Sequence, residues 1–221
     1  KCTKIVDSKN LLKDLKKYEE AYISFQKVSE MNPDFALAYY WQGKIFIELD
    51  RKEEALIFFT KATKNMPDND FLWYELGILL EDLEKYEDAL LCFEKAIKIQ
   101  PDYAEAWIHR GMILNEFDRD QESLASFNKA IEIQPDNAEA WYGKGTSLHG
   151  LKKFREEIPA LKKAIEIDPF HLPSLYQLGL AYEKLQEYEN SLTYYGIVIK
   201  SYPDWAKAWN RQGLVLCQLN R

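Results

Sequence analysis

The residues that could do chemistry in this chain are few and scattered. The 221 residues include three histidines and three cysteines, which are His109, His149, His171, Cys2, Cys92 and Cys217. No histidine belongs to an HExxH motif or to a cluster with cysteines, so the sequence predicts no metal and no cofactor. The cysteines are odd in number, far apart and without CxxC spacing. This disfavours a disulfide framework and favours a reducing compartment such as the cytoplasm.

Adjacent carboxylates are the other candidates for catalysis. Two such pairs are Glu53–Glu54 and Glu156–Glu157. The acidic residues mostly have a lysine or arginine three or four positions away, which is typical of a solvated helix face. The chain has no nucleophile motif and no glycine-rich phosphate loop, because its glycines are spread along the sequence. The sequence therefore predicts that this chain is not an enzyme by itself.

Composition and charge exclude further classes of function. Apolar residues make up 47% of the chain and charged residues 29%, which is typical of a folded globular protein. The net charge of −7 argues against a nucleic-acid surface, which needs basic side chains to neutralise phosphates, and against an anionic membrane surface. No run of 18 apolar residues occurs, so no segment is expected to span a bilayer. The chain begins with Lys1, so we expect a fragment whose targeting signal would lie outside it.

Proline and glycine recur along the chain at an interval of 34 residues. Two stretches one interval apart are nearly identical, IQPDYAEAWIHRG at 99–111 and IQPDNAEAWYGKG at 133–145. Six of the eight prolines follow the interval, namely Pro33, Pro67, Pro101, Pro135, Pro169 and Pro203. Six of the nine glycines do the same, namely Gly43, Gly77, Gly111, Gly145, Gly179 and Gly213. A period of this length indicates a repeat architecture.

Each repeat has the pattern of two antiparallel helices. We number the repeat positions from position 1, which is Ala36, Asp70, Ala104, Ala138, Leu172 and Ala206 in turn. Apolar or small residues occupy positions 4, 8 and 11 and then 20, 24 and 27, and both sets have the spacing of one helical face. The proline ends the second helix because it cannot continue it. Glycine at position 8 and a small residue at position 20 let the helices approach closely, so a larger side chain there should cost about 1–3 kcal/mol.

This pattern resembles the tetratricopeptide repeat (TPR) family. Repeat 2 carries the family motif as Trp73, Leu76, Gly77, Leu80, Tyr86, Ala89, Phe93, Ala96 and Pro101. The resemblance implies an all-α fold, a right-handed α-solenoid or superhelix of stacked antiparallel helix pairs. Each pair would bury its apolar face against its neighbours. The tryptophans at position 4, such as Trp107 and Trp141, are expected to be buried anchors.

The pattern divides the chain into repeats. Five complete repeats are expected at 36–69, 70–103, 104–137, 138–171 and 172–205, and the first helix of a sixth at 206–221. Residues 1–35 form a degenerate N-terminal repeat with the weaker pattern Leu12, Tyr18, Ala21, Phe25, Val28 and Pro33. Repeat 4 is irregular, because Glu157 stands at position 20 and Pro159 lies inside the second helix. Pro159 predicts either a tolerated kink or a hinge between the two halves of the chain.

One face of the first helices is more apolar than a solvated surface requires. Position 5 is tyrosine in four of six repeats, and position 9 is apolar in four. These residues either pack between adjacent first helices or line a groove for a peptide or a partner helix, where aromatic rings supply contact area with few rotors. The resemblance favours the groove, because the concave face of the first helices is the usual binding surface in TPR proteins. The predicted binding residues are Tyr40, Trp41, Lys44, Tyr74, Ile78, Ile108, Met112, Tyr142, Tyr176, Lys207 and Arg211.

The charge of this face is uneven. Acidic residues lie in its middle repeats, and Lys207 and Arg211 make its C-terminal end basic. A basic, amphipathic segment is therefore the favoured partner, and its affinity should fall with added salt. The two basic residues also resemble part of the carboxylate clamp of chaperone-binding TPR proteins. The rest of that clamp is absent, because Tyr142, Thr146 and Gln177 stand where lysine or asparagine is needed, so a chaperone co-factor role is disfavoured.

Three functions fit this pattern. The first is a protein-interaction scaffold that binds a peptide or a partner helix in the groove formed by the first helices. The second is a non-catalytic arm of a larger enzyme or regulator, which brings substrates to a domain outside this sequence. The third is a self-assembly module that forms a homo-oligomer through uncapped terminal helices. We expect the first of these.

Overall fold

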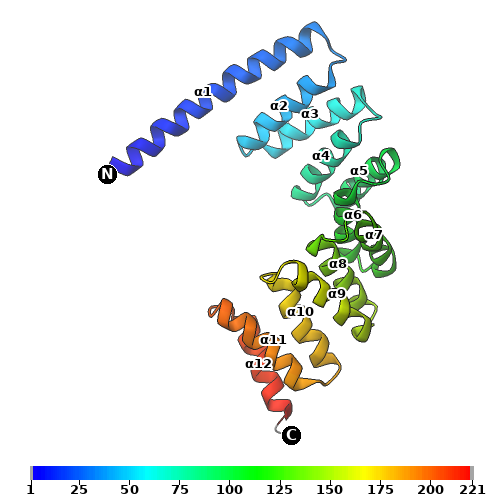
Figure 1. Ribbon diagram of the computed structural model, residues 1–221. Coiled ribbons are helices and arrows are strands. Elements are labelled where there is room, and N and C mark those ends of the chain that lie inside the picture. The colour runs from blue at the N-terminus through cyan, green and yellow to red at the C-terminus, as the bar shows by residue number, and fades with distance from the viewer. Residues whose placement is uncertain (1, 220–221) are drawn as a thin grey trace. The chain divides into compact units, whose positions relative to one another are not determined.

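The computed structural model describes residues 2–219, with side chains from Lys16 onward. These residues form helices and no strand, which confirms the all-α prediction. The chain divides into two compact units, residues 1–101 and 102–221, and each is considered by itself. The first unit contains α1 (Cys2–Met31), α2 (Ala36–Glu48), α3 (Lys52–Asn65), α4 (Asp70–Asp82) and α5 (Tyr86–Ile99) (Figure 1). The second contains α6 (Ala104–Glu116), α7 (Asp120–Ile133), α8 (Ala138–Gly150), α9 (Phe154–Ile167), α10 (Leu172–Lys184), α11 (Tyr188–Ser201) and α12 (Ala206–Leu219).

Consecutive helices pack as pairs within each unit. In the first unit α2 packs chiefly on α3, and α4 on α5. In the second unit α6 pairs with α7, α8 with α9 and α10 with α11, while α12 packs on α11. Adjacent pairs also contact one another, as α7 contacts α8 and α9 contacts α10. The structure therefore confirms the stacked helix pairs that the 34-residue period predicts.

The centre of each pair is a large side chain at position 24 that lies on the glycine at position 8. These side chains are fully buried: Phe59, Phe93, Phe127, Leu161 and Tyr195. A Cβ atom added to Gly43 would lie 2.5 Å from Cδ2 of Phe59, and one added to Gly179 would lie 2.5 Å from Cε1 of Tyr195. Both distances are far inside van der Waals contact, so the ring leaves room only for glycine.

Gly179 and Gly213 occupy the same repeat position but should respond to alanine in opposite ways. Tyr195 cannot withdraw from Gly179, because its ring is fully buried and its hydroxyl donates to Glu183 at 2.9 Å. We expect Gly179→Ala to lower the free energy of unfolding by about 2 kcal/mol. No atom of another helix lies within 4 Å of the added Cβ at Gly213, so Gly213→Ala should raise it by about 0.5–1 kcal/mol. Urea denaturation of both variants measures the difference, and two changes of the same sign would contradict this packing.

The tryptophans at position 4 tie the loops between repeats to the first helices. The Nε1 of Trp141 donates to the carbonyl oxygen of Pro135 at 2.8 Å. The same bond joins two further pairs, Trp73 to Pro67 and Trp209 to Pro203. Trp107 and Trp141 are half-buried rather than buried, which corrects the expectation for them. In Trp141 the polar edge of the ring is held at the loop by this bond. The spacing of six residues between proline and tryptophan therefore has a structural cause.

The turn inside each repeat depends on a residue with a left-handed backbone. Five residues at position 15 have φ angles of 55–60°, namely Asp50, Glu84, Asp118, Lys152 and Gln186. In repeat 4 the following amide, that of Lys153, then donates to the carbonyl oxygen of Leu148 at 2.8 Å and closes the end of α8. Glycine is the residue that adopts such a conformation most easily, and none of the five is glycine.

We therefore expect Lys152→Gly to raise the free energy of unfolding by about 0.5–1 kcal/mol. A left-handed conformation costs a residue with a Cβ atom about 1–2 kcal/mol, and the greater freedom of glycine in the unfolded chain offsets part of the gain. Asp118→Gly should gain less, because aspartate tolerates this conformation better than lysine does. Urea unfolding of the two variants measures both values. A loss of stability in Lys152→Gly would show that the lysine side chain makes a contribution larger than the backbone strain.

Helix α1 differs from the other repeats because it runs without a turn from Cys2 to Met31. Its C-terminal half packs on α2 as a second helix would. The Tyr22 ring lies 5.5 Å from the Phe46 ring in an edge-to-face contact, and Phe25 stacks on Trp41 at 6.1 Å. The side chain of Leu12, which belongs to the predicted degenerate repeat, lies outside the described side chains. The assignment of residues 1–35 to such a repeat stays a prediction.

Helix α9 continues through Pro159 and has the same 14-residue length as α7. Pro159 is exposed, and it has no amide hydrogen to donate to the carbonyl oxygen of Arg155. The hinge hypothesis stays a prediction. A hinge should give α8 and α9 weaker protection against hydrogen exchange than α6 and α7. Equal protection in the four helices would leave only a tolerated kink.

Candidate functional site

In the first unit, Tyr40 is an interior residue of the predicted binding face. Its ring centre lies 5.6 Å from that of Phe59 and 5.4 Å from that of Phe71, so Tyr40 fills the joint between α2 and α4. Burial, and to a lesser extent the carboxylate of Glu75, raise the pKa of its hydroxyl to about 12. The Nζ of Lys44 lies 3.3 Å from Oε2 of Glu75 and forms an ion pair between the same two helices. Tyr40 is therefore a buried packing residue beneath the predicted binding face.

Three apolar side chains around Tyr40 are exposed. Leu37, Trp41 and Phe71 expose 39%, 47% and 40% of their surface. Leu37 and Trp41 are one helical turn apart on α2, and the ring of Tyr40 contacts both Trp41 and Phe71. Single exposed apolar residues are ordinary, whereas neighbouring ones form the kind of patch that marks an interaction surface. We call these three residues the Trp41 patch.

The second unit has a hollow on its first-helix side, between α6 and α8. Its volume is about 160 Å³, and it is lined by Met112, Asn115, Glu116, Phe127, Glu139, Tyr142, Gly143 and Thr146. Two of the predicted binding residues, Met112 and Tyr142, therefore lie together. The two helices are linked at the hollow because Nδ2 of Asn115 donates to Oγ1 of Thr146 at 2.8 Å. We call this space the α6–α8 hollow.

Tyr142 lies between the α6–α8 hollow and the joint with α10. Its ring centre is 5.2 Å from that of His171, and Nε2 of His171 lies 3.2 Å from Oε2 of Glu139. Burial, and then the charge of Glu139, raise the pKa of the Tyr142 hydroxyl, so it remains a neutral hydrogen-bond donor at physiological pH. Tyr142 combines the two interpretations of the sequence, since it packs in a joint and also lines the hollow.

Four other predicted binding residues belong neither to the Trp41 patch nor to the lining of the α6–α8 hollow. Ile108 is buried in a cluster behind the hollow, because position 5 of α6 turns toward α8. Tyr176 stacks on Trp205 with 5.1 Å between ring centres, in the joint between α10 and α12. Tyr74 and Ile78 of α4 are half-buried. The predicted residues therefore form separate small groups, each attached to a joint between first helices.

The charged residues predicted for this face are partly engaged inside the protein. At the C-terminal end, Nη1 of Arg211 lies 3.2 Å from Oε1 of Glu183, while Lys207 is exposed. Glu139 contacts His171, as described above. Glu116, which lines the α6–α8 hollow, is exposed, and within the described side chains no basic residue lies at ion-pair distance from it. The acidic part of the face thus keeps an available carboxylate, whereas Arg211 is already paired.

A serine, a histidine and a glutamate form a chain of contacts at the start of α10 that the sequence did not reveal. Oγ of Ser174 lies 2.7 Å from Nδ1 of His171, and Nε2 of His171 lies 3.2 Å from Glu139. A hydrolytic triad needs an accessible nucleophile. Ser174 is fully buried, and Nδ1 of His171 also accepts the Ser174 amide at 3.3 Å. These residues therefore cap α10 and tie it to α8.

The irregular residue Glu157 lies in a buried polar cluster that was not predicted. No part of Glu157 is exposed. Its two carboxylate oxygens lie 3.1 and 3.0 Å from Nδ1 of His149 in α8, and Nε2 of Gln177 in α10 donates to Oε1 at 3.1 Å. The only signal in the sequence was a glutamate at position 20, where the other complete repeats have alanine or serine. The cluster joins repeats 4 and 5.

The described part of the chain contains neither a metal-binding cluster nor a helix suited to span a membrane. Among residues with described side chains, no group of histidine, cysteine, aspartate or glutamate is arranged to hold a metal ion. None of the helices within residues 2–219 combines the length and the apolar composition that crossing a bilayer requires.

Family models described as tetratricopeptide repeat match most of the chain. One model matches residues 10–70 and 74–138, a second matches 138–171 and a third matches 174–204. No curated protein matches the chain.

Several solved structures share the fold. YrrB, described as "a TPR protein with an unusual peptide-binding site", has 23% sequence identity and a TM-score of 0.74 over 86% of this chain and 97% of that chain. MamA from Desulfovibrio magneticus RS-1 has 21% identity and a TM-score of 0.72 over 77% of this chain and 97% of that chain. PilF from Pseudomonas aeruginosa has 14% identity and a TM-score of 0.74 over 90% and 91%. At these identities the likeness concerns the fold.

Proposed function

Because the chain belongs to the tetratricopeptide repeat family, we propose that it is a protein-interaction scaffold whose first-helix face binds a peptide or a helix of a partner protein. The observation that carries the proposal is the α6–α8 hollow, an open space lined by Met112 and Tyr142. The exposed Trp41 patch supports the same kind of contact in the first unit. Among the structural neighbours, YrrB is described as having a peptide-binding site.

The size of the hollow indicates what part of a partner it accepts. Its volume of about 160 Å³ is smaller than the roughly 300–1,000 Å³ of pockets that hold drug-sized ligands. It therefore fits one anchoring side chain of a longer segment. Interface energy is commonly concentrated in a few such anchors, and the surrounding contacts exclude water.

The charge of the hollow favours a lysine or an arginine as that anchor. The methylene groups of a long basic side chain would lie on Met112 and Tyr142, and its charged end would reach Glu116 or Glu139. Exposed charge pairs of this kind are screened by salt and contribute mainly to specificity and association rate. Binding should therefore weaken as the salt concentration rises, and binding that is insensitive to salt would argue against a basic anchor.

Affinity capture with three immobilised proteins tests the proposal. The wild-type chain should retain the partner, and the double variant Glu116→Lys with Tyr142→Ala should lose it. Glu132→Lys is the matched control, because Glu132 is an exposed residue of α7 that pairs with Lys129 and does not line the hollow. Circular dichroism confirms that all three proteins are folded. Equal capture of the same partner by all three would contradict the proposal.

Self-association is a second candidate function, because α12 exposes a row of apolar side chains. Trp209, Leu216 and Leu219 have the helical spacing of one face and expose 51%, 46% and 38% of their surface. A second copy that covers this face would bury apolar area of the kind that stabilises oligomers. Light scattering at several protein concentrations tests this candidate. A strict monomer over the whole concentration range would eliminate it.

A further inference from the structure

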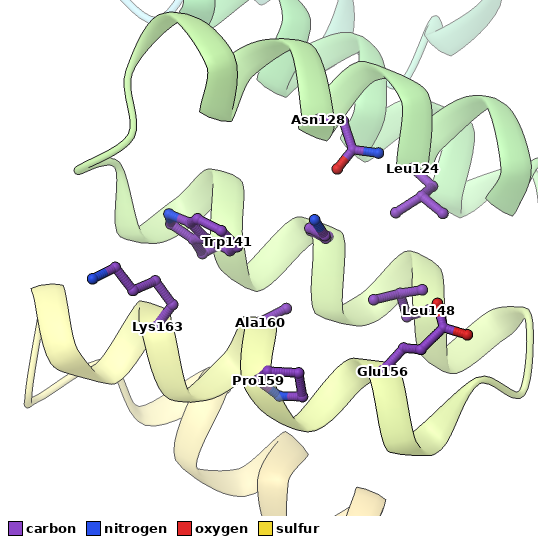
Figure 2. Close-up of a pocket in the computed structure, with 9 residues that line it drawn as sticks. Leu124, Asn128, Trp141, Leu148, Glu156, Pro159, Ala160 and Lys163 are labelled. Carbon is purple, nitrogen blue, oxygen red and sulfur yellow. The ribbon is translucent and has the colours of Figure 1, made fainter.

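A second concave surface lies on a different side of α8 from the α6–α8 hollow. Figure 2 shows that α8 forms its floor and that α7 and α9 form its two sides. The floor is made by Trp141 and Leu148, and the apolar parts of the sides are Leu124 of α7 and Ala160 of α9. Its volume is about 480 Å³, which lies within the usual range of ligand pockets. We call this surface the outer trough.

The outer trough is open because the residue at position 23 of repeat 4 is small. In repeat 5, the residues that correspond to Leu148 and Ala160 are Tyr182 and Tyr194. Their rings stack with 5.6 Å between centres and an interplanar angle of 9°. The same chain therefore fills this space with two aromatic rings in one repeat and leaves it empty in the preceding one. Of the two differences between the repeats, the one at Ala160 is the larger change in side-chain size. The single substitution Ala160→Tyr should therefore fill the trough.

An equivalent trough occurs in the first unit and shows which feature is special to repeat 4. It has a volume of about 450 Å³, and its apolar lining lies 68 residues earlier at Leu56, Trp73, Leu80 and Cys92. The apolar lining thus recurs. At position 7, however, the first unit has Leu76 where the outer trough has Lys144. Lys144 is therefore the charge that distinguishes the outer trough from the trough of the first unit, whereas Lys163 has a counterpart there in Lys95.

Two ammonium groups border the apolar floor of the outer trough. The Nζ of Lys144 lies 5.2 Å from the ring centre of Trp141, and no carboxylate with a described side chain lies at ion-pair distance from it. Lys163 pairs at 2.8 Å with Glu166 on its own helix, an exposed pair that contributes little energy and is easily exchanged. Glu156 also lines the trough, at its Leu148 end, and lies 3.7 Å from Nζ of Lys153 (Figure 2). A carboxylate placed above Trp141 would therefore meet the two positive groups, while an apolar side chain beside it would cover the Trp141 ring.

The length of the trough sets the size of the segment that fits. Its side on α9 runs from Glu156 to Lys163, eight residues whose seven steps of 1.5 Å span about 10 Å. An extended peptide rises about 3.3 Å per residue, so about three residues fit. We propose that the outer trough binds an extended segment of a partner protein in which an aliphatic or aromatic side chain stands next to an acidic residue. This surface is independent of the proposed first-helix site and takes the opposite charge.

Selection from a random octapeptide library displayed on phage tests this inference. Peptides enriched on the wild-type chain should share an apolar residue beside aspartate or glutamate. One enriched peptide is then synthesised with a fluorescent label and its affinity measured by anisotropy. Ala160→Tyr, which copies the residue of repeat 5, should weaken binding more than tenfold. Lys144→Gln should weaken it about fivefold, with no further loss when the peptide acid is replaced by its amide.

The controls separate this inference from the proposed function. Glu116→Lys on the first-helix face should leave the affinity of the enriched peptide unchanged. Circular dichroism shows whether Ala160→Tyr disturbs the fold. Lys144 is a half-exposed surface residue, so Lys144→Gln is not expected to disturb it. Lys144→Gln therefore still tests the inference if Ala160→Tyr does not fold. The inference is overturned if no peptide is enriched, if the enriched peptides lack an acidic residue, or if neither substitution at the trough weakens binding.

Discussion

Replacing Phe127 by alanine should lower the free energy of unfolding by about 3–5 kcal/mol, the usual range for removing a fully buried aromatic ring. Phe127 has no exposed surface. Its ring lies against Gly111 of its own repeat and Gly143 of the next repeat, and a Cβ atom at either glycine would clash with it. The cavity would therefore open at a contact that two repeats share. Urea denaturation followed by far-UV circular dichroism measures the loss.

Trp141→Ala is the matched comparison for Phe127→Ala. Trp141 is larger than Phe127 but only half-buried, and it lines the outer trough. Its truncation should cost less, roughly 2 kcal/mol, because less apolar surface leaves contact with the protein. A larger loss for Trp141→Ala than for Phe127→Ala would contradict the conclusion that the residues at position 24, and not the tryptophans, are the main anchors.

His149→Ala should lower the free energy of unfolding by about 2–3 kcal/mol, because it removes a hydrogen-bond partner from a fully buried carboxylate. After the substitution, Glu157 would keep Gln177 as its one described side-chain partner. The desolvation of the carboxylate would then be poorly compensated. The same urea denaturation measures this loss, with Lys153→Ala on the exposed turn after α8 as a variant of little expected effect.

A second substitution distinguishes this explanation from a simple loss of packing by His149. Glu157→Ala installs the residue that repeats 1 and 2 have at position 20, where Ala55 and Ala89 are fully buried. In the double variant His149→Ala with Glu157→Ala no carboxylate is left without its partner. We therefore expect the double variant to be more stable than His149→Ala alone. If the loss of stability in the double variant equals the sum of the losses in the two single variants, the two side chains do not interact.

The helix pairs and their internal contacts could be predicted from the sequence because they repeat with the sequence period. Phe127 lies on Gly111 for the same reason that Phe59 lies on Gly43, and positions 8 and 24 record this contact in every complete repeat. The left-handed residue at position 15 has the same period but was not predicted, because none of the five residues is glycine. A contact that recurs with the repeat period can therefore be predicted from the sequence only where the residue type also recurs.

The exposure of the binding face could not be predicted in the same way, since it depends on contacts between neighbouring pairs. Tyr40 is covered by Phe71 at position 2 of the following repeat, whereas Tyr142 meets His171 at the last position of its own repeat. Both tyrosines stand at position 5, yet one is buried and the other lines a hollow. A single repeat position therefore does not determine whether a side chain is available to a partner.

The polar cluster around Glu157 shows the same limit. The sequence marks Glu157 as a departure from the pattern, but its two partners come from two other helices, His149 from α8 and Gln177 from α10. Gln177 reaches the carboxylate only because α10 packs on α9 in a particular register. Such a register is fixed by side-chain packing along the whole contact between two helices, and no local motif records it.

Site-specific photo-cross-linking is the most direct test of the claim that the first-helix face holds a partner polypeptide. A benzophenone-bearing amino acid in place of Met112 would lie in the α6–α8 hollow, and the same group in place of Lys129 would lie on the exposed side of α7. With the captured partner bound, irradiation should give a covalent product from position 112 and none from position 129. A product from position 129 and none from position 112 would contradict the claim.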